Sequence, residues 1–181
     1  MDAAVLKAQI RSCVKCPLHV NRTLGVPGYA KSINPKMAVV GDGPGGDENS
    51  TGYPFVSASG PYLRRQMARL GIQEDEVLFT YTISCRSFGP PPVEAVTACS
   101  PWRELEYATY GTKVRLLMGR AACEPIFGKK SISSIRGTVI ISDESNIYVA
   151  TYSPSAVTRN PELEEMFLGD LALAWALANG T

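Results

Sequence analysis

Residues 37–49 read MAVVGDGPGGDEN, and this stretch decides the fold. Met37 to Gly41 form a short apolar run, which predicts a strand that is buried on both faces. The run ends in a loop rich in glycine, proline and acidic residues. Ligands of open α/β sheets bind outside the carboxyl ends of the strands, so the loop that begins at Asp42 is a candidate functional site.

Strand-like and helix-like segments alternate along the rest of the chain. Further strands are expected at residues 76–83, 114–118, 138–142 and 147–151, with a turn at 143–146. Helices are expected at residues 2–12, 61–70, 92–110, 119–126 and 161–179. This alternation predicts an α/β fold, a three-layer sandwich with a mostly parallel central sheet flanked by helices. With neither an internal repeat nor a break in composition, we expect a single domain over residues 1–181.

The composition excludes several functional classes. Of 181 residues, 45% are hydrophobic and 19% are charged, so the chain can bury a sizeable core. Its net charge is +1, so a nucleic-acid partner would be held by a local basic patch. The sequence has neither an apolar run long enough to span a membrane nor a signal sequence at its start, which predicts no membrane partner and a cytoplasmic location. His19 is the single histidine, so neither a Ser-His-Asp triad nor a His-rich zinc site is expected.

Five cysteines in a cytoplasmic protein indicate metal ligands or reactive thiols more than disulfides. Cys13 and Cys16 form a CxxC motif, and Cys85 and Cys99 follow in one later segment. The four suggest a four-thiolate site, although the spacing does not distinguish zinc from an iron–sulfur cluster. The alternative is four unrelated buried thiols. Cys123 lies in an apolar helical stretch and is expected to be a small core residue.

A series of motifs then points to a family. In chain order they are CVKCPL, VPGYA, VVGDGPGGDENSTGYPFVSASGPYL, SCR, ACSPW, LLMGRAA, IRG and TYSPSAVTRNP. Over residues 13–161 the chain resembles the iron–sulfur, thermostable type of uracil-DNA glycosylase, usually called family 4, with relatives in bacteriophage DNA polymerases. Residues 41–63 are the most specific piece of this resemblance, because GYPFV and SASG follow the glycine-rich loop.

The resemblance implies a cofactor and a partner. The cofactor is a 4Fe-4S cluster, favoured over zinc, on Cys13, Cys16, Cys85 and Cys99. The partner is single- or double-stranded DNA, in the cytosol of a bacterium or of a phage-infected host. An enzyme of this kind flips the altered nucleotide into a pocket. The glycosidic bond then breaks toward an oxocarbenium-like sugar, which a nearby carboxylate stabilises while it orients water.

The same resemblance assigns roles to residues of the first loop. Asp42 occupies the water-activating acidic position, and Glu48 matches a second acidic position in the motif. Gly43 would let the backbone approach the base closely. Phe55 matches the aromatic residue on which the flipped uracil stacks. The alternatives are solvated loop acids for the two carboxylates and a core position for Phe55.

Three positions depart from the family pattern. Tyr81 stands where the family has an asparagine that reads the edge of uracil, and a phenol does not offer the paired donor and acceptor of an amide. Ser153 stands where the family has a histidine, and serine brings no positive charge to the leaving base. Asp42 replaces a glutamate and is shorter by one methylene. Losing one stabilising donor costs about 3 kcal/mol, so we expect uracil excision to be weakened.

Contact with DNA is expected from the loop after Pro154. Ser155 and Arg159, with Thr158 and Asn160, suit phosphate contact and, by resemblance, the loop that enters the minor groove. A modest basic edge is expected from Lys129, Lys130 and Arg136, although such a charge pair is more often a solvated turn.

The sequence supports one main function and two alternatives. The main hypothesis is a divergent DNA glycosylase that acts on uracil or another altered base and carries a structural cluster. One alternative is a non-catalytic DNA-binding or assembly protein that keeps the fold and the cluster. The other is a base-modification enzyme with an altered pocket.

Overall fold

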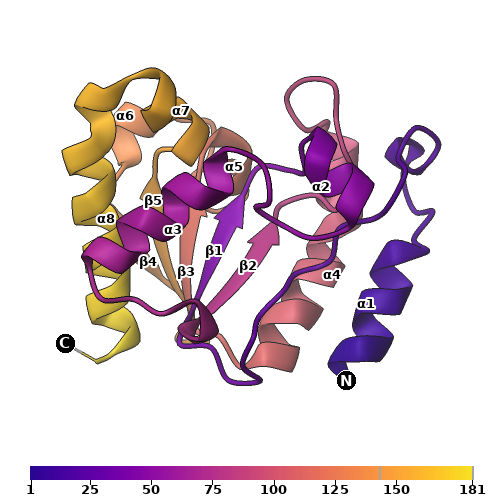
Figure 1. Ribbon diagram of the computed structural model, residues 1–181, viewed down its shortest axis with the longest axis horizontal. Coiled ribbons are helices and arrows are strands. Elements are labelled where there is room, and N and C mark those ends of the chain that lie inside the picture. Colours follow the sequence, from indigo (N-terminus) through magenta and orange to yellow (C-terminus); the bar gives the residue numbers. More distant parts are fainter. Residues whose placement is uncertain (143, 181) are drawn as a thin grey trace.

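A five-stranded sheet forms the centre of the computed structural model, which describes residues 1–142 and 144–180 (Figure 1). In sheet order the strands are β2 (Val77–Tyr81), β1 (Met37–Gly41), β3 (Val114–Met118), β5 (Ile147–Thr151) and β4 (Val139–Ile141). β1 pairs in parallel with β2 and β3, β3 pairs in parallel with β5, and β4 runs antiparallel to β5. The predicted mostly parallel sheet is confirmed.

Helices cover both faces of this sheet, which confirms the three-layer sandwich (Figure 1). They are α1 (Ala3–Arg11), α2 (Gly46–Thr51), α3 (Ser59–Arg69), α4 (Val93–Tyr110), α5 (Arg120–Phe127), α6 (Ile132–Ile135), α7 (Pro154–Arg159) and α8 (Glu164–Ala178). Short 3₁₀ turns cover Pro17–His19, Glu74–Glu76 and Pro161–Leu163. Within residues 1–142 and 144–180, no helix is both long and apolar enough to cross a bilayer.

The alternation of side chains along the strands explains the two cores. Met37 and Val39 of β1 pack with α3 and α8, whereas Ala38 and Val40 pack with α4 and α5. All residues of β1, β2 and β3 are buried, as expected for parallel strands that are covered on both faces. α1 lies outside this sandwich and packs against α4, where Leu6 and Ile10 contact Trp102.

Several boundaries differ from the predicted ones because side chains cap short helices. The loop after β1 contains α2, where the Glu48 side chain accepts from the N–H of Gly45, the residue before the helix, and the Gly45 carbonyl accepts from the Asn49 N–H. The segment expected as a DNA-contacting loop contains α7, which Ser153 caps. The closing helix begins as a 3₁₀ turn at Pro161 and becomes α-helical at Glu164. The predicted turn at 143–146 includes Asp143, which lies outside the described residues.

A buried ion pair joins α4 to the end of β2. The Arg103 Nη1 atom donates to Thr80 Oγ1 at 2.6 Å and to the Tyr81 carbonyl at 2.5 Å, and Nη2 donates to Ser84 Oγ at 2.9 Å. Its counter-charge is Glu106, which lies 3.3 Å away and also accepts from Thr80 Oγ1. The Gly28 N–H completes the cluster by donating to Glu106 Oε1 at 2.6 Å. The cluster therefore fixes the connector before β1 as well as the end of β2.

Removing both partners of this pair should cost less than the sum of the two single losses. Arg103→Met is expected to destabilise the fold by about 3–5 kcal/mol, because it leaves the Glu106 carboxylate buried without a cation. Glu106→Leu should have a similar effect for the converse reason. The double variant should lose clearly less than the sum, since neither charge remains in the interior. Urea denaturation of the parent and the three variants measures this, and strictly additive free energies would contradict a coupled pair.

Candidate functional site

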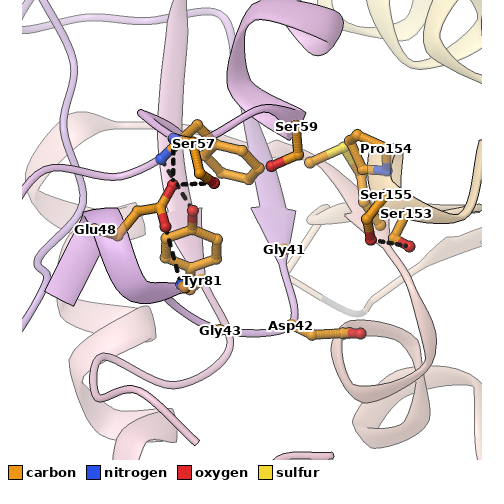
Figure 2. Close-up of a pocket in the computed structure, with 13 residues that line it drawn as sticks. Gly41, Asp42, Gly43, Glu48, Ser57, Ser59, Tyr81, Ser153, Pro154 and Ser155 are labelled. Carbon is orange, nitrogen blue, oxygen red and sulfur yellow. Dashed lines mark hydrogen bonds between the residues drawn. The ribbon is translucent and has the colours of Figure 1, made fainter. Parts of the chain in front are cut away.

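A cavity of about 170 Å³ opens at the carboxyl ends of β1, β2 and β3, beside the segment that follows β5 (Figure 2). Its lining residues are Gly41, Asp42, Gly43, Gly45, Glu48, Phe55, Ser57, Ser59, Tyr81, Met118, Ser153, Pro154 and Ser155. All the predicted catalytic and substrate-binding residues except Arg159 are among them. Ser57, Ser59 and Met118 were not predicted, although the SASG motif contains both serines.

Glu48 holds together the segment that forms one wall of the cavity (Figure 2). Its Oε1 atom accepts from the N–H groups of Val56 and Ser57, at 3.0 and 2.8 Å, and from Ser57 Oγ at 2.7 Å. Its Oε2 atom accepts from the Gly45 N–H at 3.0 Å. The side chain is fully buried. One carboxylate therefore joins the beginning and the end of residues 45–57.

The donors around Glu48 also set its charge. Burial raises the pKa of a carboxyl group, but the hydrogen bonds from Ser57 and Gly45 outweigh burial here. The pKa of Glu48 therefore lies below its usual value, and the carboxylate is ionised at neutral pH.

Asp42 follows β1 and reaches the start of α5. Its Oδ1 atom accepts from the Ala122 N–H at 3.0 Å. Gly119, at φ 104°, makes this approach possible, because a Cβ atom there would lie 2.8 Å from Asp42 Oδ2. Burial raises the pKa of Asp42, and the N–H groups of Ala122 and Ala121 offset part of that rise. Figure 2 shows the carboxylate on the opposite side of the cavity from Glu48.

Phe55 and Tyr81 form a stacked aromatic pair at the cavity wall. Their ring centroids lie 4.6 Å apart at an interplanar angle of 22°, and the two residues are only 2% and 5% exposed. The backbone of Phe55 is left-handed, at φ 55°, and its N–H donates to the Tyr81 hydroxyl oxygen at 2.9 Å. Arg64 Nη1 donates to the Phe55 carbonyl at 2.7 Å. Gly41 packs under both rings, since a Cβ atom there would lie 2.9 Å from Tyr81 and 3.0 Å from Phe55.

The remaining cavity residues lie near the start of α7 and in the first loop. Ser153 Oγ accepts from the Ala156 N–H at 3.2 Å and lies 3.2 Å from Ser155 Oγ. Gly43 lines the cavity. It has no side chain, which leaves room for Ile83, because a Cβ atom at position 43 would lie 2.8 Å from the Ile83 side chain.

Four cysteines lie away from the cavity, where α1 meets α4. All are free thiols; Cys16, Cys85 and Cys99 are buried, and Cys13 is half-buried. Trp102 Nε1 donates to Cys13 Sγ at 3.3 Å, and Arg22 Nη1 donates to Cys85 Sγ at 3.0 Å.

The thiols lie close enough to influence one another electrostatically. Burial raises the pKa of Cys85 and of Cys99, and neighbouring thiols raise each further. Within the part of the chain that the structure describes, no three His, Cys, Asp or Glu side chains are grouped so that they could hold a metal ion. Cys123 is 1% exposed and donates to the Leu117 carbonyl, so its predicted place in the core is confirmed.

The predicted basic residues differ in their environments. Arg159 is exposed at the end of α7 and makes no hydrogen bond or ion pair with its side chain among residues 1–142 and 144–180. Lys129 and Lys130 are also exposed. The prediction for Arg136 is wrong, because its guanidinium pairs with the buried Asp170, with Nε 2.9 Å from Oδ2. Its charge is therefore largely neutralised within the fold.

Comparison with known proteins identifies the family of this chain. A family model described as the uracil DNA glycosylase superfamily matches residues 27–175. A type-4 uracil-DNA glycosylase of Sulfurisphaera tokodaii is 32% identical, over 91% of this chain and 80% of that protein. Type-4 uracil-DNA glycosylases of Pyrobaculum aerophilum and Archaeoglobus fulgidus are 30% and 31% identical, over 96% and 90% of this chain and over 93% and 86% of those proteins. The chain therefore belongs to the uracil-DNA glycosylase superfamily, and within it to the type-4 family, as its motifs indicate.

The Glu48 contacts predict a pH-dependent loss of stability. Glu48→Gln should destabilise the fold by about 2 kcal/mol at pH 7, because an amide offers one oxygen to donors that now share two. A depressed pKa in the fold means that the carboxylate's contribution is complete above the unfolded-state pKa and is lost as pH falls through the folded-state pKa. The gap in melting temperature between parent and variant should therefore narrow below about pH 4. Thermal unfolding by circular dichroism between pH 7 and pH 3 measures it.

Glu165→Gln is the matched control for this variant. The Glu165 side chain is 85% exposed, so its replacement should leave the melting temperature unchanged at every pH. A gap for Glu48→Gln that stays constant down to pH 3 would contradict an ionised, hydrogen-bonded Glu48.

Proposed function

We propose that the protein is a DNA glycosylase that hydrolyses the N-glycosidic bond of uracil or another altered base in DNA. The observation that carries the proposal is the position of Asp42, a partly buried carboxylate that faces a cavity at the strand ends in a chain of this superfamily. The relatives of this chain are type-4 uracil-DNA glycosylases, which supports uracil as the base. DNA is then the partner.

Asp42 has the properties that the reaction needs. Once a nucleotide is flipped out of the helix, its glycosidic bond breaks toward a positively charged sugar. A carboxylate at the cavity wall stabilises that charge and orients the attacking water. The Ala122 N–H keeps the carboxylate in one orientation, and Glu48 keeps the opposite wall in place. Asp42 acts as the anion, so activity should fall as the pH is lowered and Asp42 becomes protonated. Because its pKa is raised, this fall should begin at a higher pH than it would for an ordinary aspartate.

The other predicted residues receive supporting roles in this proposal. Ser153 and Ser155, whose hydroxyl oxygens lie 3.2 Å apart at the cavity, would donate hydrogen bonds to the departing base or to a phosphate of the DNA backbone. The exposed Arg159 at the end of α7 would contact a phosphate. Gly43 would keep the cavity floor free of a side chain.

The four cysteines fit a structural iron–sulfur cluster by their chemistry. Cys13, Cys16, Cys85 and Cys99 are all free, and N–H groups of Trp102 and Arg22 point at two of the sulfurs, as is typical of cluster ligands. The cluster would supply a covalent link between the end of α1, the segment after β2 and α4. It takes no part in the hydrolysis that we propose.

A second candidate function is DNA binding without catalysis, and one observation favours it. Phe55 and Tyr81 are almost completely buried against each other, so the face of the Phe55 ring is not exposed for a base to stack on. A single-turnover assay on uracil-containing oligonucleotides separates the two functions, since only the enzyme leaves an abasic site.

Asp42→Asn is expected to lower the single-turnover rate on a uracil-containing oligonucleotide by about a hundredfold or more. Asparagine keeps an oxygen for the Ala122 N–H, so the fold should persist while the counter-charge for the sugar is lost. The measurement is alkaline cleavage of the abasic product, resolved by electrophoresis. Asp47→Asn is the control, because Asp47 is exposed and lies outside the cavity lining. Equal rates for both variants and the parent would contradict the role of Asp42.

The cluster makes a separate prediction. Aerobically purified protein should be brown, with broad visible absorbance that dithionite bleaches. Replacing Cys13, Cys16, Cys85 or Cys99 by serine should remove the colour and much of the stability, because the ligand bonds close a long loop of the chain. Cys123→Ser should keep the colour, because Cys123 is a core residue on another part of the fold. Colourless protein with stoichiometric zinc would contradict the iron–sulfur assignment.

A further inference from the structure

The pairing of Phe55 with Tyr81 has the form of an occupied base site. A second ring lies nearly parallel to the Phe55 ring, and an oxygen at the edge of that second ring accepts from the Phe55 N–H. Proteins hold an extruded nucleobase through the same two contacts, a stack on an aromatic face and hydrogen bonds to the edge of the base. Both contacts here are made by a residue of the chain itself.

We propose that Tyr81 is a built-in substitute for a pyrimidine base, so that a base binds against Phe55 only after the Tyr81 side chain has moved away. The inference rests on the proposed function in taking the ligand to be a nucleobase. It adds that the closed pocket is a property of one residue, and that this residue sets how readily any base is accepted.

Burial shows that the site is filled by Tyr81. Phe55 is 2% exposed and Tyr81 is 5% exposed, and the edge of Phe79 packs against Phe55 with centroids 6.0 Å apart. Below the pair, the bare backbone of Gly41 is in contact with both rings. The 170 Å³ cavity lies beside the pair, with Asp42 and Ser153 on its walls (Figure 2). A base stacked on Phe55 would therefore take the space of the Tyr81 ring, and its sugar would lie in the cavity.

The backbone of Phe55 gives a second reason to regard Tyr81 as a substitute for a base. Phe55 is held in a left-handed conformation that non-glycine residues seldom adopt, and this conformation points its N–H at the Tyr81 oxygen. A buried N–H without an acceptor is costly, so the site needs an oxygen there whether or not a base is bound. Tyr81 supplies it in the free protein, and a pyrimidine carbonyl would supply it in the complex.

Binding of free uracil tests this without DNA or catalysis. Removing the ring in Tyr81→Ala should raise the affinity for free uracil, measured by NMR titration, by about tenfold or more, because one base–aromatic stack becomes available. Tyr81→Phe keeps the ring and should bind uracil no better than the parent. Tyr110→Ala is the matched control, because Tyr110 is also a buried tyrosine but lies in the core on the other face of the sheet.

A second variant guards against unfolding. If Tyr81→Ala does not give a folded protein, Tyr81→Val removes the ring but introduces a β-branched residue suited to β2, and it should show the same gain in uracil affinity. The inference is overturned if the parent binds uracil as tightly as Tyr81→Ala or Tyr81→Val, or if Tyr81→Phe gains as much as they do.

The outcomes also separate this inference from the proposed function. If Tyr81→Ala or Tyr81→Val gains uracil affinity but neither they nor the parent excise uracil from an oligonucleotide, the inference stands and the proposed function fails. If the parent excises uracil and none of these variants changes uracil affinity, the proposed function stands and the inference fails.

Discussion

The buried ion pair of Arg103 and Glu106 is the constraint on which the two functional regions depend. Arg103 lies one turn after Cys99 in α4, and its guanidinium donates to the Tyr81 carbonyl and to Ser84, the residue before Cys85. The same side chain therefore sets where β2 ends and where the cysteine segment begins. Low surrounding polarity makes such a pair costly to form and more costly to break, so α4 and β2 have little freedom to shift independently. The cavity and the four thiols are thus parts of one rigid arrangement.

Much of the fold follows from residue pattern, because β1, β2 and β3 are buried on both faces and have mostly apolar sequences. β1 and β3 match their predicted bounds, and the alternation of strands with helices gives the parallel order. The apolar pattern does not predict the short helices that are capped by a polar side chain. α2 depends on Glu48, which caps Gly45 while it also binds Ser57, and no local apolar period marks that helix. α7 depends on the Ser153 hydroxyl in the same way.

The candidate site shows the same division. The motifs predicted that Asp42, Glu48, Phe55, Tyr81 and Ser153 share one site, and all five line the same cavity. Asp42 follows β1, Tyr81 ends β2 and Ser153 comes shortly after β5, whereas Glu48 and Phe55 lie in the segment between β1 and α3. What the sequence does not reveal is which neighbours each side chain finds. Glu48 faces backbone N–H groups of its own segment, and Arg136 finds Asp170, a partner 34 positions away. The stack between Tyr81 and Phe55 likewise joins residues from two elements whose separation only the folded chain fixes.

Ser153 both lines the cavity and caps α7, and the cap limits which residues can replace it. Its hydroxyl accepts from the Ala156 N–H and so caps α7, a contact worth about 1 kcal/mol in a typical helix. A histidine at this position lacks that hydroxyl. A lineage that exchanged serine for the family's histidine would gain a donor for the base and lose the cap of the helix that presents Arg159. Replacing Ser153 by histidine therefore destabilises the fold unless a neighbouring residue first provides another cap for α7. The order in which these two substitutions arise therefore matters for the evolution of this chain.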